Sequence, residues 1–520
     1  MESRFVRVFG WVIVAAAVIG QVLVRPSPDV SWLLYATQRI LHGARLGVDI
    51  LEVTPPMIFL PKLVVVSIAN TIKVGIWQAW IVGMIALTVG SIILTVRLLP
   101  ALLRLNRTLA SLAPLVIAFV MLVVPGADFG QREHLTAILV LPYVVLASRR
   151  LTQEQTPHHL AVITGVMAGI GLGIKPLFII LFAGLLGLQA WRLGRGVLKP
   201  EHWSLLVVGA CYLVLVGVMI PGYYAYAMDY GTLYMAYLAR TPWQTIGSGP
   251  GSLPGLIAIG IFGILRRSLT DPRRALAYAL ATAVLAFYLA AVLHGKGWRY
   301  QFLPSILFGC LLIGLAVSGV VQRLRMVPRL GRGLGVAMAG LFVLAPIPGT
   351  INRLTEPRSP SHDADPNLAT LVPIIRQSGD GVTLAVLSSN IASAFPLVLE
   401  SGAEWTMRSP SLWPLIAFVS DPLEWGRLIE TRTPDRWGPL EREFVAGTIA
   451  NLIAERPKLL LVLRPSSLAL GWGGARQLDY LAYFLQQAQF RDFFAQYHPL
   501  QSSGDYDLYE RTTAGTPSSP

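Results

Sequence analysis

The chain has 520 residues, of which 54% are hydrophobic and only 13% are charged, and its mean hydropathy is +0.58. This balance excludes a soluble globular chain, and repeated apolar runs of about 17–25 residues predict a polytopic α-helical membrane protein. The formal net charge of +14 comes mostly from arginine, and membrane topology explains it better than nucleic acid binding does.

The first apolar run predicts a helix over residues 8–25, and the sequence then continues "RPSPD". No small-residue cleavage site follows the run, so we interpret it as a retained membrane helix rather than a secretory signal. Residues 26–75 form a long loop after this helix. Within the loop, "PPMIFLPKLVVVSIANTIKVG" is apolar but is interrupted by Pro61 and Lys62. We therefore predict a helix on the membrane surface here, and not a span.

Lysine and arginine accumulate on one side of the predicted membrane domain. Cytoplasmic loops are enriched in these residues, so we place the N-terminus, with Arg4 and Arg7, in the cytoplasm. A span in place of the surface helix would move every later arginine cluster to the other side. The pattern predicts eleven spans, over residues 8–25, 76–96, 109–125, 135–148, 159–174, 176–191, 203–220, 253–265, 276–293, 302–320 and 333–348.

The last third of the chain has a different pattern. "GVTLAVLSSN" and "KLLLVLRPSS" are typical of buried strands, whereas "EREFVAGTIANLIAER" and "LDYLAYFLQQAQFRDFFAQY" have helical periodicity. Strands that alternate with helices predict a small α/β domain. We therefore divide the chain into a membrane domain, residues 1–350, and an extracytoplasmic α/β domain, residues 351–520, which begins with a polar linker and ends in a disordered segment.

The ionisable residues that are costly near a bilayer fall on the predicted outer face. Such groups usually pair, face a cavity or line a substrate path. Because five loops supply them, one of which is rich in tyrosine, we interpret the set as a single polar chamber. The alternative is a scatter of interfacial side chains whose charged ends reach water. The set comprises Asp29, Asp49, Glu52, Asp128, Arg132, Glu133, His134, Lys175, Asp229, six tyrosines between residues 223 and 237, His294, Lys296, Arg299 and Tyr300.

Single members of the set have simpler explanations. Asp29 follows "PSP" after the first helix and belongs to a residue type that caps helix N-termini. Glu133 could neutralise Arg132 within "GADFGQREH", and Lys175 in "GIKP" could anchor a helix at the membrane interface. "HGKGWRY" combines two cations, two glycines and aromatic residues, which suits a phosphate but also an interfacial aromatic belt.

The order of these pieces resembles the GT-C superfamily of membrane glycosyltransferases, which use polyprenyl-phosphate sugars. Protein O-mannosyltransferases and the lipid A aminoarabinose transferase are its nearest parallels. The matching pieces are an acid after the first helix ("SPDVSW"), "QRILHGARLGVDI" before "EVTPPMIFL", a second acid motif ("GADFG") and a late "GKGWRYQFLP" segment. The resemblance covers the architecture from residue 1 to about 350, and an outward-facing C-terminal domain also fits it.

The resemblance implies an inverting sugar transfer on the outer membrane face, with Asp29 as the general base that deprotonates an acceptor hydroxyl. Asp128 is the second candidate catalytic residue. The departing polyprenyl phosphate needs positive charge nearby, which helps most in a partly desolvated site. The candidates that bind this phosphate are Arg132, Lys175, Lys296, Arg299 and Tyr300. Residues expected to support the substrates are Glu52, Glu133, His134, His294 and Trp298. Asp128 and Glu52 are also the candidate ligands of a divalent metal ion, Mg²⁺ or Mn²⁺.

Other function classes stay open at this point. A lipid-linked glycan flippase or exporter fits the many spans, although no inverted repeat is visible. A polysaccharide polymerase or ligase would use related chemistry, and a scaffold of an envelope complex would use the tail as its binding module. For the transferase, the expected partners are a polyprenyl-phosphate-linked sugar, membrane lipid, and a glycan, lipid or protein acceptor, without nucleic acid. The expected location is the bacterial inner membrane, with the C-terminal domain in the periplasm.

Overall fold

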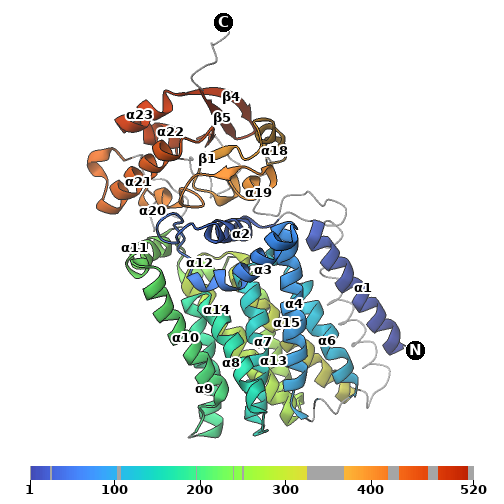
Figure 1. Ribbon diagram of the computed structural model, residues 1–520. Helices are drawn as coiled ribbons and strands as arrows, with labels where there is room; N and C mark the ends of the chain where they lie inside the picture. Colours follow the sequence, from blue (N-terminus) through green and yellow to red (C-terminus); the bar gives the residue numbers. More distant parts are fainter. Residues whose placement is uncertain are drawn as a thin grey trace. The chain divides into compact units, whose positions relative to one another are not determined.

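The computed structural model describes residues 2–23, 26–101, 103, 107–194, 196–237, 239–248, 251–324, 368–419, 432–465 and 478–512. The chain forms two compact units, whose elements are labelled in Figure 1. Unit 1 comprises Met1–Val24, Thr54–Val218 and Thr241–Ser359, and unit 2 comprises Arg25–Val53, Met219–Arg240 and Pro360–Pro520. The predicted eleventh span, the boundary at residue 350, the polar linker and the C-terminal end lie outside the described residues.

Unit 1 is built from apolar helices. Its elements are α1 (Glu2–Leu23), η1 (Pro56–Ile58), α3 (Phe59–Ile72), α4 (Ile76–Leu98), α6 (Arg107–Leu122), η2 (Gly126–Asp128), α7 (Arg132–Leu151), α8 (His158–Gly173), η3 (Pro176–Phe178), α9 (Ile179–Leu193), α10 (Pro200–Met219), α12 (Pro242–Ile246), α13 (Leu253–Leu265), η4 (Arg266–Ser268), α14 (Asp271–His294) and α15 (Arg299–Leu324). They agree closely with the apolar runs of the sequence.

Within the described residues, six helices are long and apolar enough to cross a membrane, or seven if the bent pair Arg7–Leu23 and Pro28–Leu41 counts as one span. The six are α4, α7, η3 with α9, α10, α14 and α15, and each coincides with a predicted span. The chain is therefore a multi-pass membrane protein. Helices α6, α8 and α13, also predicted as spans, are shorter, as is the predicted surface helix Pro56–Ile72. The count of eleven stays a prediction.

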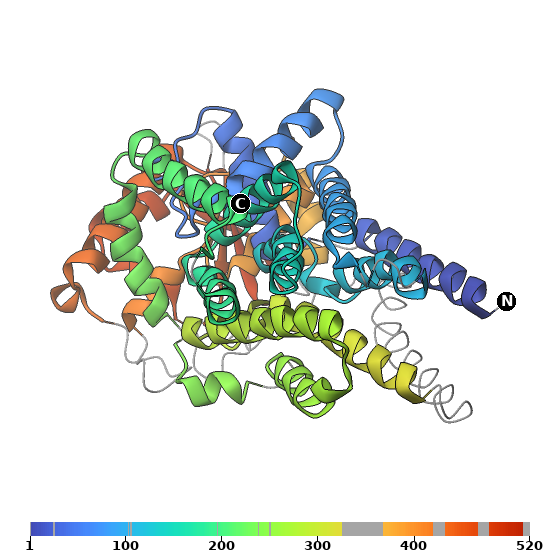
Figure 2. The same ribbon diagram turned by 90° about the horizontal axis from the view of Figure 1, so that it is seen from below.

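Helix α7 forms the centre of unit 1. Every residue from Glu133 to Ser148 is buried, and the helix packs against α4, α8, α14 and α15. A helix that is apolar around its whole circumference buries all its faces in this way. By contrast, α1 and α10 lie at the edge of the bundle in Figures 1 and 2, and α10 exposes Val214 and Val218.

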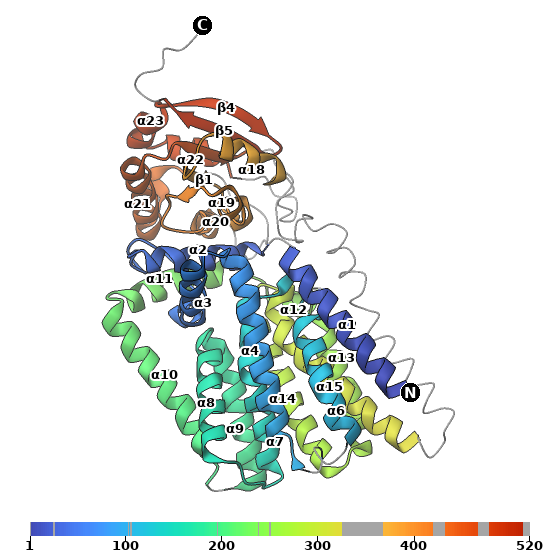
Figure 3. The same ribbon diagram turned by 45° about the vertical axis from the view of Figure 1, so that its right-hand side comes forward.

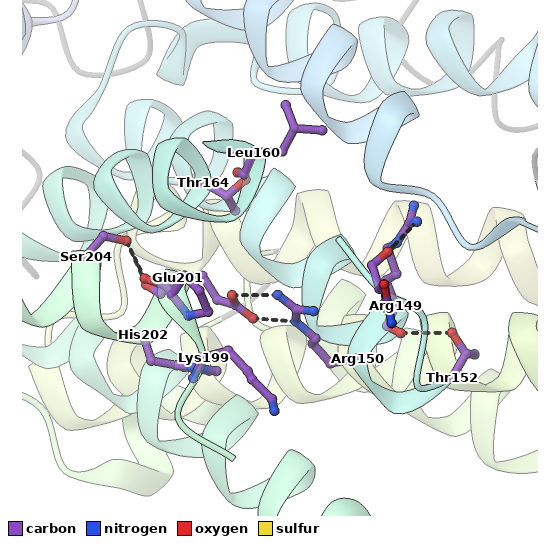
Figure 4. Close-up of polar contacts among 11 residues, drawn as sticks. Arg149, Arg150, Thr152, Leu160, Thr164, Lys199, Glu201, His202 and Ser204 are labelled. Atoms are coloured by element: carbon purple, nitrogen blue, oxygen red, sulfur yellow. Dashed lines mark hydrogen bonds and ion pairs between the residues drawn. The ribbon is translucent and has the colours of Figure 1, made fainter. Parts of the chain in front are cut away.

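An ion pair joins the C-terminal end of α7 to α10 (Figure 4). Arg150 forms two parallel hydrogen bonds with buried Glu201, with Nε–Oε1 at 2.8 Å and Nη2–Oε2 at 2.9 Å. Ser204 donates to the Glu201 carbonyl oxygen at 3.2 Å. Gly165 on α8 lies so close to α10 that a Cβ atom would be 2.0 Å from Ser204 Oγ. Helix α10 is thus joined to α7 by an ion pair and to α8 by close helix contact.

Unit 2 combines an α/β domain with two helices from earlier in the chain. Its elements are α2 (Pro28–Leu41), α11 (Tyr223–Ala236), α18 (Leu368–Gln377), β1 (Thr383–Leu387), η5 (Ile391–Ser393), α19 (Leu397–Ser401), β2 (Glu404–Trp405), α20 (Trp413–Val419), η6 (Pro434–Arg436), α21 (Pro439–Glu455), β3 (Leu459–Leu463), α22 (Tyr480–Leu485), α23 (Ala488–Phe494), β4 (Tyr497–Ser503) and β5 (Tyr506–Arg511). Helix α2 contacts η5, and α11 contacts α20.

The five strands form one sheet in the order β2-β1-β3-β5-β4. Figure 3 shows β4 and β5 side by side. The first three strands are parallel, and β5 and β4 are antiparallel. The two strands predicted from the sequence are β1 and β3, which lie side by side and are almost wholly buried. Long runs of Leu and Val are typical of strands covered on both faces.

Three local features differ from the expectation. The tyrosine-rich segment, expected as a loop, forms helix α11, in which Tyr226 stacks on Tyr230 one turn later with ring centroids 4.7 Å apart. The predicted helix near the C-terminal end is broken into α22 and α23. Strands β4 and β5 were not predicted; the "GD" dipeptide between them, Gly504 and Asp505, is the hairpin signal that could have found them.

Candidate functional site

The predicted site residues are divided between the two units. Asp29 and Glu52 belong to unit 2. So do Asp49, Asp229 and the six tyrosines of the predicted polar set. The other candidate site residues belong to unit 1, and they are Asp128, Arg132, Glu133, His134, Lys175, His294, Lys296, Trp298, Arg299 and Tyr300.

Two predicted acids in unit 1 are held in ion pairs with predicted cations. Asp128, in η2 after α6, accepts a hydrogen bond from Arg299 at the start of α15. Glu133, in the first turn of α7, pairs with Lys175, which precedes η3. The Glu133 side chain is fully buried, and its Oε2 atom has no hydrogen-bond partner among the described residues. Glu133 is therefore neutralised by a lysine 42 residues away in the chain, and not by its neighbour Arg132.

The "HGKGWRY" turn between α14 and α15 directs a lysine into unit 1. Gly295 and Gly297 both have positive φ, at 67° and 69°, a conformation that glycine adopts at little cost. Lys296 between them is only 1% exposed, and burial lowers the pKa of its amine to about 7. After the turn, Trp298 stacks on Tyr300 with centroids 5.7 Å apart. The Lys175 amine lies 5.7 Å from the Tyr300 ring centroid.

Three of the predicted cations converge on one histidine. The charges of Lys175, Lys296 and Arg132 all act on the ring of His294, at the end of α14. His294 Nδ1 lies 2.8 Å from Gln301 Nε2, so the amide donates to this ring nitrogen. Arg132 also donates to Thr54 Oγ1 at 2.6 Å. These cations come from α7, η3 and the α14–α15 turn, so only the tertiary fold brings them together.

A further cation, Lys62, belongs to the same region but was not predicted as a site residue. Its side chain is 1% exposed, and its amine lies 3.6 Å from the centroid of the Trp80 ring. Among the described residues no carboxylate pairs with it. Burial and the nearby Arg132 both lower the pKa of Lys62. The signal in the sequence was a lysine inside an apolar run. We took this lysine only as evidence that the run does not span the membrane. We call Lys62, Arg132, Lys175 and Lys296 the basic cluster.

His134 has a backbone-binding role in the structure. Gly130 N donates to its Nδ1 at 3.1 Å, and its Nε2 lies 2.6 Å from Met121 O. The first bond makes Nδ1 the acceptor, so Nε2 carries the proton and donates to Met121. Both ring nitrogens are used to hold the "GADFG" segment between α6 and α7. Trp80, which lies under Lys62, also donates to this segment, at Gly130 O.

Asp29 and Glu52 both belong to the part of the first loop that lies in unit 2. Asp29 is half-buried in the first turn of α2, whose N-cap is Ser27, so the capping explanation does not apply to Asp29 itself. Trp32, one turn later, donates its indole N–H to Glu52 Oε2. The charge of Asp29 also acts on Tyr237, at the end of α11. The exposed Asp49 instead pairs locally with Arg45.

The divalent metal site with Asp128 and Glu52 as ligands stays a prediction. Nowhere in the described ranges do three His, Cys, Asp or Glu side chains come together as ligands. Asp128, one of the two candidate ligands, is engaged by Arg299. We therefore derive no step through a metal ion.

No family model and no curated protein matches the sequence. Among solved structures, the crystal structure of ArnT from Cupriavidus metallidurans bound to undecaprenyl phosphate is similar over 99% of both chains, with a TM-score of 0.56 and 14% identity. The cryo-EM structure of the arabinofuranosyltransferase AftD from Mycobacteria matches 99% of this chain and 40% of that chain, with a TM-score of 0.48 and 14% identity. ArnT is a GT-C enzyme, so the first of these similarities confirms that the chain has the GT-C fold predicted from its motifs.

Proposed function

We propose that the protein is an inverting glycosyltransferase that moves a sugar from a polyprenyl-phosphate donor to an acceptor hydroxyl. The observation that carries this proposal is the basic cluster within a membrane helix bundle of the GT-C fold. Ionisable groups inside a membrane helix bundle usually mark a substrate path, and clustered cations create a positive potential that suits a phosphate. The phosphate of a lipid-linked donor fits this potential, and its polyprenyl chain fits an apolar helical surface. ArnT, which has the same fold, binds undecaprenyl phosphate.

The cluster suits the charge change of the reaction. The donor is a phosphodiester with one negative charge, whereas the departing polyprenyl phosphate is a monoester with a charge of about −1.5 to −2 at neutral pH. Lys62, Lys175 and Lys296 therefore face more negative charge after the bond breaks than before it. Positive groups that are fixed in a desolvated site stabilise such developing charge most effectively.

In the proposed reaction Asp29 is the general base. Its carboxylate takes the proton of the acceptor hydroxyl while the hydroxyl oxygen forms a bond to C1 of the sugar. The bond from C1 to the phosphate oxygen breaks, and the electron pair leaves with the polyprenyl phosphate. Attack opposite the leaving group inverts the anomeric centre. Glu52, held by Trp32, supports the acceptor side.

We also propose the topology that the sequence predicts. The N-terminus lies in the cytoplasm of a bacterial inner membrane, the chain crosses the membrane eleven times, and the C-terminal domain is periplasmic. Lipid-linked sugars are used on this outer face in the proposed reaction. The acceptor is a hydroxyl of a glycan, lipid or protein of the envelope.

The experiment compares envelope glycans and lipids by mass spectrometry in cells with and without the chain. A mass increment that depends on the chain identifies the transferred sugar. We expect Asp29→Asn to lower the rate of modification by about 10²-fold or more, the usual contribution of a general base. Purified Asp29→Asn protein should bind undecaprenyl phosphate as the wild type does.

Asp492→Asn is the control, since it removes an exposed acid of unit 2, on α23, outside the first loop and α2. It should retain the wild-type rate. Full activity of Asp29→Asn would remove this residue from the mechanism. Transport of a lipid-linked glycan without any new glycosidic bond would make the protein a flippase instead.

A further inference from the structure

Helix α2, which carries Asp29, is packed against the aromatic residues of the α/β domain within unit 2. Phe395 lies at the centre of this contact. Its ring meets Trp32 and Tyr35 of α2 at centroid distances of 5.3 Å and 5.7 Å, and Trp405 of β2 at 5.4 Å. Trp32, Phe395 and Trp405 are each at most 3% exposed. Aromatic contacts of this geometry add about 0.5–1.5 kcal/mol per pair beyond area burial.

Hydrogen bonds fix the same helix in register with the domain. The Tyr35 hydroxyl accepts from the backbone N–H of Trp405 at 2.8 Å. Arg39 donates to Met407 O at 3.4 Å. A buried N–H that pairs with a side chain leaves few alternative positions for that side chain, because an unmade bond costs about 1–3 kcal/mol.

The end of the first loop is tied to the same segment of the domain. Leu51 N donates to Arg408 O at 2.7 Å, and Arg408 Nε donates to Val48 O at 2.6 Å. Glu52 is the next residue in the chain. The loop is therefore held just after Asp29, through α2, and just before Glu52, through the Val48–Leu51 segment.

Trp32 connects the two acids. It lies three residues after Asp29 and so on the same side of α2. Its indole N–H binds Glu52 Oε2 while its ring packs on Phe395. One side chain thus joins the helix of Asp29, the carboxylate of Glu52 and the core of the α/β domain.

We propose that the α/β domain positions the acids of the transfer site, with Trp32 as the positioning residue that orients Glu52 and Phe395 with Trp405 as the support of α2. The domain is then a part of the machinery of transfer and not an appended binding module. This inference rests on the proposed function, because it takes Asp29 and Glu52 as the acids that act on the acceptor.

The first test is Trp32→Phe, which keeps an aromatic ring against Phe395 but removes the N–H that binds Glu52. We expect the rate of envelope modification per protein molecule to fall about tenfold or more, since small errors in position cost large factors in rate. Undecaprenyl phosphate affinity and Tm should stay near the wild-type values. In a Glu52→Gln background Trp32→Phe should cause little further loss, because it acts through Glu52.

The second test compares two tyrosines of unit 2 whose hydroxyls each bind a backbone group. Tyr35→Phe removes the acceptor of the Trp405 N–H, and Tyr497→Phe removes the hydroxyl that donates to Pro457 O at 2.5 Å. Tyr497 lies on β4 and makes none of the α2 contacts described above. We expect both variants to lower Tm, and Tyr35→Phe alone to lower the rate.

Equal rates for the two tyrosine variants, or an undiminished effect of Trp32→Phe in Glu52→Gln, would overturn the inference. Its failure is separable from that of the proposed function. An inactive Asp29→Asn with a fully active Trp32→Phe removes only the positioning role. An active Asp29→Asn removes the proposed base, whatever Trp32→Phe does.

Discussion

At the scale of single residues, the most informative feature is a lysine held inside unit 1 by a turn. The two left-handed glycines around Lys296 reverse the chain between α14 and α15 and leave the side chain between them almost without solvent contact. Burial disfavours the charged amine, which is why its pKa falls to about 7. An adjacent phosphate favours the charged form. Binding of the lipid phosphate should therefore be linked to protonation of this residue.

This linkage predicts that donor affinity depends on pH. In the free protein Lys296 is charged below about pH 7 and neutral above it. Affinity should therefore fall as pH rises from 6 to 9, by at most about tenfold per pH unit for one proton. A methyl-capped undecaprenyl phosphate keeps the ligand charge constant, and titration at several pH values measures the slope.

Lys296→Arg is the control for this prediction, since arginine stays charged throughout this range. The change of log affinity with pH should be smaller in Lys296→Arg than in the wild type, by about one proton. We attribute any remaining pH dependence to Lys62, which is also buried. The same slope in both proteins would show that Lys296 does not contact the phosphate.

At the scale of helices, close contact in unit 1 depends on glycines at particular positions. Gly165 and Gly169 on α8 both face α10, where added Cβ atoms would lie 2.0 Å from Ser204 Oγ and 2.8 Å from Val208 Cβ. Small residues four apart allow membrane helices to approach closely, without any hydrophobic drive between them. "GVMAG" is this pattern in the sequence. The glycines bring α8 close to α10, and the nearby Arg150–Glu201 pair joins α10 to α7.

Gly165→Ala should therefore destabilise the protein by about 1–3 kcal/mol, the usual cost of overpacking. The nearest obstacle after Ser204 Oγ is the Glu201 carbonyl oxygen at 2.2 Å, and backbone cannot rotate away. The midpoint of thermal unfolding in detergent measures the change. Gly209→Ala on α10 meets nothing within 4 Å and should be neutral or slightly stabilising. Equal midpoints for the two variants would contradict the packing argument.

At the scale of the whole molecule, the arginine pattern assigns sides to the loops. The six long apolar helices agree with predicted spans, and Arg149 and Arg150 end α7 where a cytoplasmic loop is expected. Arg150 is engaged by Glu201, so part of the charge expected in the cytoplasm also serves to join helices. The side on which the C-terminal domain lies follows from the number of spans.

Single cysteines test this topology in a protein with Cys211 and Cys310 replaced by alanine. We expect a membrane-impermeant maleimide to label Gln501→Cys, on exposed β4, in intact inner-membrane vesicles of right-side-out orientation. His158→Cys, exposed at the start of α8, should be labelled only after permeabilisation. Labelling of both sites from the same side would refute the eleven-span topology, which places an odd number of spans between His158 and Gln501.

The sequence by itself determined the apolar helices, the two central strands and the motifs of the GT-C fold. Each of these is encoded locally, by the length and period of hydrophobic residues or by a short string such as "GKGWRYQFLP". The sequence also identified three of the four residues of the basic cluster as candidates, because a charge next to an apolar run is unusual. Lys62 was not predicted as a site residue, because its place in the basic cluster depends on contact with Trp80 and on the nearby Arg132. These residues lie 18 and 70 positions further along the chain.

Only the tertiary structure decided which charges meet and which elements share a core. The pairing of Glu133 with Lys175, and the packing of α2 and α11 with the α/β domain, join segments that are up to several hundred residues apart. Hydrophobic periodicity shows which face of an element is buried, but many partners can cover the same face. The partner is selected by the packing of whole elements, and that packing also decides which buried charges form pairs.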